Sequence, residues 1–189
     1  RKEAEKALQE SENLYRALVE NSHAGISLVD DSYQLIYVND EHCRILGYER
    51  EELQNLDFRE TLAEETAQTV IDGYQAHQRG DFSPQLYEFM IKRKDGAKRW
   101  VEVSVVSITD SKGKRFSIAQ MLDIHERKEA ETALKQSENL YRAVVENSHD
   151  GISLLDDSSR ITYVNDEYCK ILGYEREEIL GRDFRETLA

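Results

Sequence analysis

An internal repeat is the feature that most limits how this chain of 189 residues can fold. Residues 1–63 and 127–189 align without a gap, and 47 of their 63 positions are identical. The offset of 126 residues between the copies is too long for a solenoid repeat but suits a small domain with its connector. The second copy ends at Ala189, which corresponds to Ala63. We therefore expect one complete unit followed by the front half of a second.

The charge of the chain limits its partners. It carries 38 acidic and 25 basic residues, for a net charge of −13. Nucleic acids and anionic membrane surfaces attract basic patches, so the acidic excess argues against both as partners. No segment approaches the roughly 20 apolar residues of a membrane span, and no signal peptide opens the chain. Cys43 and Cys169 occupy equivalent repeat positions, which gives no disulfide framework. We expect a soluble, cytoplasmic protein.

The front half of the first unit shows both helical and strand patterns. Apolar residues at alternating three- and four-residue steps predict a helix over residues 1–20. Short runs of strand-forming residues predict strands over 25–29 and 33–38. Asn39 has the character of a helix N-cap, and Gly47 that of the residue that ends the same helix.

The back half of the unit changes from a helical to a strand period. Residues 63–78 carry apolar side chains at helical spacing, and Asp95-Gly96 is a strong hairpin signal. Three strands are expected on either side of the turns, at 85–92, 99–109 and 116–122. The element order predicts an α+β fold, in which an antiparallel sheet has its helices on one face. We expect strand 116–122 to pair within this unit and not with residues 151–155.

Several motifs follow one another in an order that a known family shares. They are Tyr37-Val38-Asn39, Leu46-Gly47-Tyr48 with Glu51-Glu52, Lys94-Asp95-Gly96 with Arg99-Trp100, and Asp123-Ile124-His125-Glu126-Arg127-Lys128. The chain resembles the PAS family over residues 11–126, and over 137–189 for a front half. His125 stands where the junction motif of the family has threonine. The resemblance implies a five-stranded antiparallel PAS sheet, a central pocket and a sensory role in a tandem PAS protein of a prokaryote.

The resemblance also implies which residues face the central pocket. They are Phe58, Tyr74, Ile91, Val101, Val103, Ala119 and Met121. These side chains are almost all apolar, which leaves two alternatives open. The interior is either a filled core without a ligand, or it binds an apolar or aromatic small molecule with the Tyr74 hydroxyl as its one polar contact.

The positions that bind flavin or haem in PAS relatives carry other residues here. Cys43 lies on the wrong helix for a photoactive cysteine, whose place is taken by Phe58. The two flavin-binding asparagines and the glutamine are replaced by Ile91, Val101 and Met121. Ile71 stands where one haem-binding subgroup has its iron ligand, and His77, near a helix end, is expected to be solvated or to cap a carbonyl. We expect no flavin, haem or other cofactor.

No nucleophile–base pair, metal-ligand cluster or phosphate-binding glycine loop is recognisable in the sequence. We therefore expect no catalytic residue and no metal site in these 189 residues, and any enzymatic activity would belong to an output domain elsewhere.

The segment after the last strand predicts a connector helix. Asp123 and Glu126 have the spacing of a capping box, and with Ile124 they form the expected signal-relay junction. Small and apolar residues repeat along the helix at three- and four-residue steps, at Ala130, Leu134, Ser137, Leu140 and Val144. The resemblance implies a parallel homodimer through helices 1–20 and 124–146. The alternative is a single helix that lies on its own sheet.

The expected organisation has four parts. They are an N-terminal helix at 1–20, a complete PAS domain at 21–124, a connector helix at 125–147 and the front half of a second PAS domain at 148–189. The expected function is a non-catalytic sensory and dimerisation module that detects a small ligand or partner. It relays the signal to an output domain, and the resemblance favours a sensor histidine kinase. The alternatives are the regulation of a cyclic-dinucleotide synthase or hydrolase, and a ligand-free structural spacer.

Overall fold

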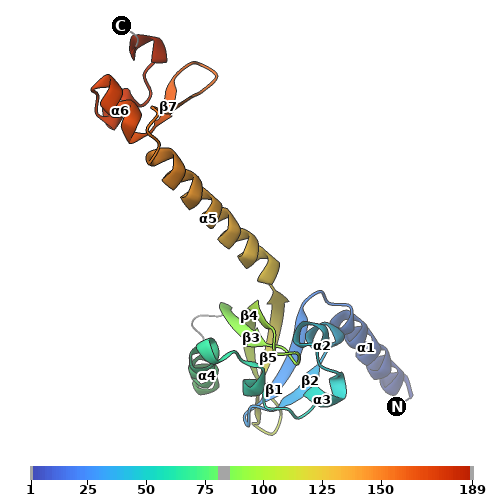
Figure 1. Cartoon of the computed structure of the whole chain (residues 1–189). Helices are drawn as coiled ribbons and strands as arrows, with labels where there is room; N and C mark the ends of the chain where they lie inside the picture. The colour runs from blue at the N-terminus through green and yellow to red at the C-terminus, as the bar shows by residue number, and fades with distance from the viewer. Residues whose placement is uncertain (1, 81–85, 188–189) are drawn as a thin grey trace. The chain divides into compact units, whose positions relative to one another are not determined.

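The computed structural model describes residues 2–80 and 86–187 of the chain. Two compact units divide it, Arg1–Lys128 and Glu129–Ala189, and each is described by itself. Figure 1 labels most of the helices and strands of both units.

Unit 1 contains five strands and most of the helices. Its front half comprises α1 (Lys2–Glu20), β1 (Gly25–Asp30), β2 (Leu35–Val38), α2 (Asp40–Leu46), α3 (Arg50–Leu53), the 3-10 helix η1 (Phe58–Thr61) and α4 (Glu64–Arg79). Its back half comprises β3 (Leu86–Lys92), β4 (Lys98–Thr109), β5 (Arg115–Asp123) and the start of α5 (His125–Glu146). The order agrees with the sequence expectation. Gln85, which we expected in the third strand, lies outside the described residues.

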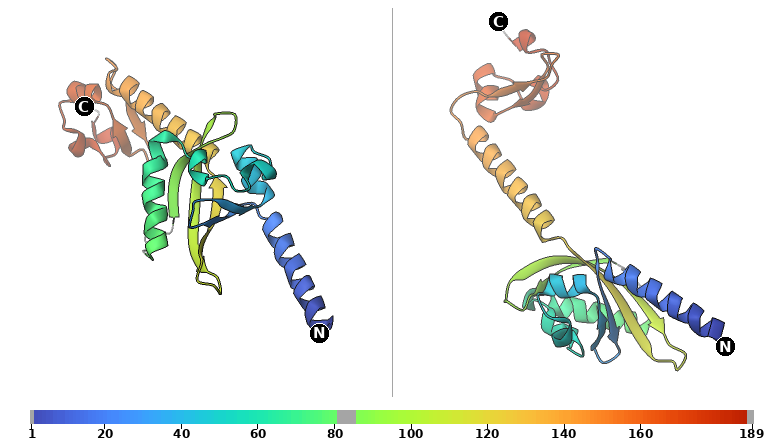
Figure 2. Two further views of the ribbon diagram at one scale, coloured as in Figure 1. Left: turned by 90° about the horizontal axis from the view of Figure 1, so that it is seen from below. Right: turned by 90° about the vertical axis from the view of Figure 1, so that its right-hand side faces the viewer.

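The five strands form one antiparallel sheet in the order β2-β1-β5-β4-β3. Strand β5 is central, because it pairs with β1 on one side and with β4 on the other. Ala119 of β5 lies opposite both Ser27 of β1 and Val105 of β4. The predicted α+β fold with a five-stranded antiparallel sheet is confirmed, and strand 116–122 pairs within its own unit as expected. Figure 2 shows two further views of this sheet.

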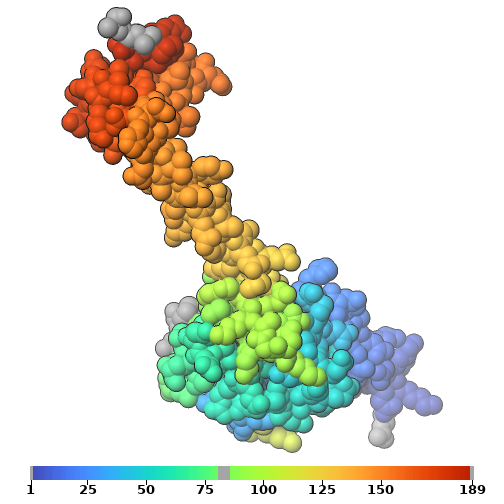
Figure 3. Space-filling view, viewed as in Figure 1, coloured from blue at the N-terminus to red at the C-terminus, as the bar shows by residue number. Residues whose placement is uncertain are grey.

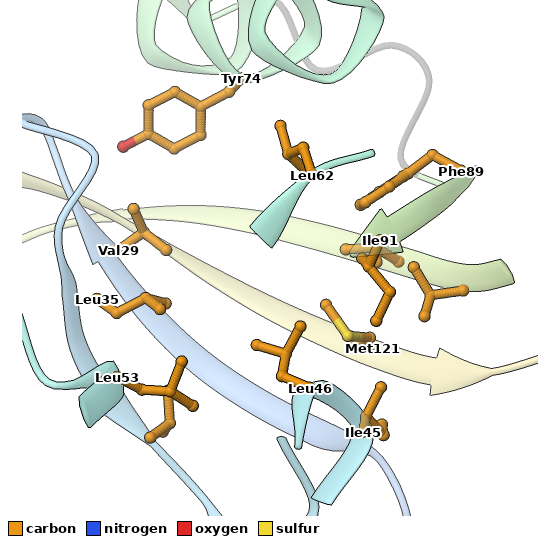
Figure 4. Packing of buried hydrophobic residues seen from close by; sticks show 13 residues of the cluster. Val29, Leu35, Ile45, Leu46, Leu53, Leu62, Tyr74, Phe89, Ile91 and Met121 are labelled. Carbon is orange, nitrogen blue, oxygen red and sulfur yellow. The ribbon is translucent and has the colours of Figure 1, made fainter. Parts of the chain in front are cut away.

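The helices α2, α3 and α4 share one face of the sheet, where the core lies (Figure 4). The core combines residues from these helices with the alternate residues of β3, β4 and β5 that point to the same face. Buried Leu46 and Leu53 come from the helices, and Ile91, Val101 and Met121 come from the strands. The alternation of β4 that the sequence shows at Val101, Glu102 and Val103 therefore separates the core face from the outer face.

Helix α2 begins and ends where the sequence predicts. The side-chain Oδ1 of Asn39 accepts a hydrogen bond from the backbone N–H of His42 at 3.0 Å. Gly47 ends the helix with φ +74°, a left-handed conformation that glycine adopts without strain. Asn39 also donates through Nδ2 to the carbonyls of Val19 and Ala24, so the same side chain fixes the entry of α1 into the unit.

Two boundaries differ from the sequence expectation. The second strand begins at Leu35, because Tyr33 has φ +67° and belongs to the turn. The predicted capping box of Asp123 and Glu126 is wrong. Asp123 is still a strand residue, paired in register with Val101, and α5 begins two residues later at His125.

Unit 2 repeats the front half of unit 1. It contains the end of α5, β6 (Ser153–Leu155), β7 (Ile161–Val164), α6 (Asp166–Leu172), α7 (Arg176–Ile179) and the 3-10 helix η2 (Phe184–Thr187). Strands β6 and β7 form their own two-stranded sheet. Ile171 is exposed, whereas its equivalent Ile45 is buried in unit 1. The difference arises because strands β3, β4 and β5 cover Ile45 in unit 1, and unit 2 has no equivalent of these strands among its described residues.

Candidate functional site

A cavity lies inside unit 1, between the sheet and the helices that cover it. Its volume is about 80 Å³. Six of the seven residues predicted to face a pocket line it: Phe58, Tyr74, Ile91, Val103, Ala119 and Met121. The seventh, Val101, is fully buried in the core beside it but does not line it. In the space-filling view, atoms of α4 and of the β3–β4 hairpin lie at the surface of unit 1 (Figure 3).

Tyr74 reaches the cavity from α4, but its hydroxyl already has protein partners. It donates to the backbone carbonyl of Asp30, and the Nε2 of Gln78 donates to it at 2.9 Å. Burial raises the pKa of Tyr74 to about 12. The hydroxyl therefore has no hydrogen left to donate to a ligand, because its one hydrogen is used within the protein.

An aromatic cluster closes the cavity beside Tyr74. The rings of Tyr33 and Phe58 each lie with their centroids 5.1 Å from that of Tyr74, in tilted arrangements. Such pairs are favoured over flat face-to-face stacking and add about 0.5–1.5 kcal/mol each beyond burial. Phe58 therefore contributes a packed aromatic ring to the lining of the cavity.

His77 is buried, with 2% of its surface exposed, which contradicts the expectation of a solvated helix end. Its Nε2 lies 2.8 Å from the hydroxyl of Tyr87 on β3, and both residues line the cavity. His77 follows Tyr74 by three residues, so the two side chains share one face of α4. That relation, visible in the sequence, could have predicted the burial of His77.

His42 is a cavity residue that the sequence expectations missed. Only 3% of its surface is exposed, and burial lowers its pKa to about 4, so the imidazole is neutral at pH 7. Its Nδ1 is buried, and no side chain or backbone group in the described part of the chain hydrogen-bonds to it. The available signal was a difference within the repeat, since Tyr168 occupies the equivalent position.

Strand β1 passes unusually close to His42. A Cβ atom added to Gly25 would lie 2.9 Å from the Cα of His42, a distance that real side chains do not tolerate. Glycine at this position lets α2 lie directly on β1. The contact fixes where the imidazole of His42 enters the cavity.

The junction between β5 and α5 is held by several bonds. The carboxylate of Asp123 pairs with Arg99 at 3.1 Å and accepts from the backbone N–H of His125 at 2.9 Å. Buried Ile124 donates its backbone N–H to the carbonyl of Trp100 at 3.0 Å. These contacts bind the start of α5 to strand β4. No hydrogen bond or ion pair of Glu126 appears within residues 2–80 and 86–187 that would give it the predicted capping role.

A family model described as the PAS fold matches residues 13–124 and 139–189. The chain belongs to the PAS family. The two matched segments correspond to the complete sheet of unit 1 and to the front-half elements of unit 2. The family resemblance seen in the sequence motifs is thereby confirmed.

Curated PAS relatives include two signalling enzymes. The chain is 25% identical over 178 residues to sporulation kinase E of Bacillus subtilis (strain 168), which covers 94% of this chain and 23% of that relative. It is 30% identical over 151 residues to the probable diguanylate cyclase DgcE of Escherichia coli (strain K12), which covers 79% of this chain and 13% of that relative. The chain thus spans less than a quarter of the length of either protein.

Solved PAS structures share the fold. The PAS domain of an HTR-like protein from Haloarcula marismortui is 29% identical, with a TM-score of 0.53, and the match covers 66% of this chain and all of that one. A PAS domain from a two-component sensor histidine kinase is 21% identical, with a TM-score of 0.52, over 61% of this chain and 97% of that one.

The PAS cavity of this chain has no charged wall. Asp, Glu, Lys and Arg are absent from the residues that line it within the described ranges. The described residues also contain no group of three or more His, Cys, Asp or Glu placed to bind a metal ion. None of the helices in these ranges is both long enough and apolar enough to span a membrane.

Proposed function

We propose that the chain is a non-catalytic, cytoplasmic sensory and dimerisation module, in which unit 1 binds a small molecule and α5 relays its presence to an output domain. One observation carries the proposal. Strand β5 both lines the cavity, through Ala119 and Met121, and leads directly into the relay helix. The wall of the binding site and the start of the helix therefore belong to one continuous strand.

The proposed relay starts from residues that a ligand would contact. Ala119 and Met121 point into the cavity, and Asp123 follows on the same face of β5 two residues later. A ligand that moves β5 would also change the geometry of two contacts. They are the ion pair of Asp123 with Arg99 and the hydrogen bond of Ile124 with Trp100. Those bonds hold the N-terminus of α5, so the proposal makes them the relay junction.

The dimer part of the proposal rests on apolar residues that neither helix buries. Leu134, Leu140 and Val144 of α5 are between 63% and 66% exposed. Leu14 and Leu18 of α1 are exposed in the same way. Apolar side chains at three- and four-residue steps are the pattern of helices that pair, and we propose that each pairs in parallel with its copy in a second chain.

The similarity to sporulation kinase E supports a sensor histidine kinase as the output. The similarity to a probable diguanylate cyclase supports the alternative, in which the same module regulates the synthesis or hydrolysis of a cyclic dinucleotide. A ligand-free spacer is the third alternative.

Thermal melting with a library of small uncharged metabolites tests the ligand-binding claim. A compound that binds the folded unit at 100 times its Kd adds about 2.7 kcal/mol to the free energy of unfolding. The matched control is Ala119→Leu, which places a larger side chain in the cavity wall and should abolish the shift. Compounds that stabilise both proteins equally would bind elsewhere and contradict the proposal, and a library without any effect would favour the spacer.

A further inference from the structure

We propose that unit 1 has a second binding site, at the end of its sheet, and that this site binds a small amino acid through its carboxylate and its ammonium group. The site is a cleft of about 380 Å³, which we call the junction cleft. Its lining residues are Arg44, Ile45, Arg93, Arg99, Asp123 and Glu126. They are distinct from the residues that line the apolar cavity, so the inference goes beyond the function proposed for that cavity.

The sheet places three charged side chains on its inner face, at the end where α5 begins. Arg99 and Asp123 each lie two positions from a core residue of their own strand. Arg93 directly follows β3, and its backbone N–H still donates to the carbonyl of Ala97 at 2.8 Å. Because side chains alternate along a strand, all three point to the face on which the core lies. The apolar core therefore has a charged end.

The junction cleft has the size of a small-molecule site. About 380 Å³ falls within the roughly 300–1,000 Å³ of typical ligand pockets. Helix α2 contributes Arg44 and Ile45 to its wall, and the first turn of α5 contributes Glu126. A molecule of the size of an amino acid therefore fits between α2, the sheet and the start of α5.

Arg93 offers the junction cleft a positive charge that has no ion pair with the described residues. Its Nη2 donates to the backbone carbonyl of Arg44 at 3.3 Å, and its Nε is enclosed by protein. The guanidinium also packs over Gly47, since a Cβ atom there would lie 3.1 Å from Nη2. Nη1, in contrast, is neither bonded within residues 2–80 and 86–187 nor enclosed. The side chain is therefore held in place with one nitrogen available to a ligand.

Glu126 supplies the matching negative charge. Arg99 pairs with Asp123 at 3.1 Å, and Arg44 pairs with Glu41 at 2.5 Å, so these charges are already neutralised. Glu126 makes no hydrogen bond or ion pair with any described residue, Arg93 included. The junction cleft thus presents one unpaired guanidinium and one unpaired carboxylate that do not bind each other.

This pair of charges selects the class of ligand. A simple anion would meet Arg93 but would be repelled by the carboxylate of Glu126, and a simple cation would be repelled by the guanidinium. A zwitterion satisfies both, because its carboxylate accepts from Arg93 and its ammonium group donates to Glu126. An amino acid carries these two groups in one small molecule.

Three probes related to alanine test the inference on the full chain. L-alanine has both charges, N-acetyl-L-alanine has only the carboxylate, and L-alaninamide has only the ammonium group. We would follow the backbone amide resonances of Arg99 and Asp123 for the Kd, and the Nε–H resonance of Arg93 for the contact itself. We expect L-alanine to bind about three- to tenfold more tightly than either other probe, the effect of one partly exposed charged contact.

Two substitutions assign the two charges. Arg93→Gln should weaken L-alanine and N-acetyl-L-alanine without weakening L-alaninamide. Glu126→Gln should weaken L-alanine and L-alaninamide without weakening N-acetyl-L-alanine. The matched controls are Lys92→Gln, whose side chain points to the opposite face of β3, and Glu138→Gln, three turns further along α5. Both controls should bind all three probes like the wild type.

The outcomes separate this inference from the function proposed for the cavity. If L-alanine does not shift Arg99 or Asp123, or if N-acetyl-L-alanine binds the wild type as tightly, the inference is wrong. Ala119→Leu, which reduces the apolar cavity, should bind L-alanine like the wild type. Loss of binding in that variant would place the amino acid in the cavity, so the inference would fail while cavity binding stands. If Arg93→Gln does not fold, the exposed Glu126→Gln variant and the wild-type comparison of probes decide the question.

Discussion

The carboxylate of Glu20 accepts hydrogen bonds from both terminal nitrogens of Arg50, at 3.1 and 2.8 Å. Tyr37 donates to the same carboxylate at 2.8 Å. Glu20 is the last residue of α1, so these contacts join the end of that helix to Arg50 of α3 and to Tyr37 of β2. The pair of Glu146 and Arg176 repeats the geometry in unit 2, at 3.1 and 2.9 Å. Each helix that leads into a PAS unit thus ends on the same carboxylate–guanidinium contact.

Glu20→Gln tests the strength of this contact. The neutral amide loses the charge-assisted bonds to Arg50, which also hold the pKa of Glu20 below its usual value. We expect the free energy of unfolding to fall by about 1–2 kcal/mol, measured by urea denaturation. Glu12→Gln, on an exposed position of the same helix, is the control and should cause no loss. Equal stabilities for the two variants would show that the contact does not anchor α1.

His42 predicts a pH dependence of stability. Its pKa is about 4 in the folded chain and about 6.5 when unfolded, so the unfolded chain binds the proton first as the pH falls. Stability is therefore complete above pH 6.5 and falls between pH 6.5 and 4, by about 3 kcal/mol from this group. His42→Phe should remove this part of the loss, as measured by urea unfolding at each pH. The exposed His23→Gln variant should keep the wild-type curve, and a similar curve for His42→Phe would contradict the burial of a neutral imidazole.

The proposed dimer predicts a change of mass on substitution of the α5 seam. Leu134→Lys with Leu140→Lys places two charges among exposed apolar positions, and charges repel in a parallel pair of helices. We expect a monomer by light scattering, with the circular dichroism of unit 1 retained. Glu138→Gln, which lies outside the seam, should remain dimeric. An unchanged dimer mass for the double variant would refute the assignment of the interface to α5.

Local signals explain why much of the fold could be predicted from the sequence. Asn39 caps α2 and Gly47 ends it through interactions within a few residues, and such signals do not depend on the rest of the fold. The burial of Val101 and Val103 followed from the alternation of side chains in a strand with one buried face. The capping box failed because ladder pairing extended β5 to Asp123, a long-range effect that spacing alone does not show.

The cavity was predicted less completely, because its lining depends on tertiary packing. Tyr74 was placed correctly, but its hydroxyl donates to the backbone carbonyl of Asp30, 44 residues away in the chain. His42 and His77 are polar residues of helices, and polar residues are fully buried less often than apolar ones. The sequence alone therefore gave little reason to expect their burial. In the folded unit, β1 passes close to His42 at Gly25, and Tyr87 of β3 contacts His77.

Amide hydrogen exchange of α5 tests the central claim, that occupation of the unit 1 cavity changes the relay helix. We would compare the full chain with and without a saturating concentration of a compound found in the metabolite screen, by mass spectrometry. The account predicts changed protection both in β5 and in the segment 125–135, and no change in either segment of Ala119→Leu. A ligand that protects the cavity residues of the wild type while the exchange of 125–135 stays the same would contradict it.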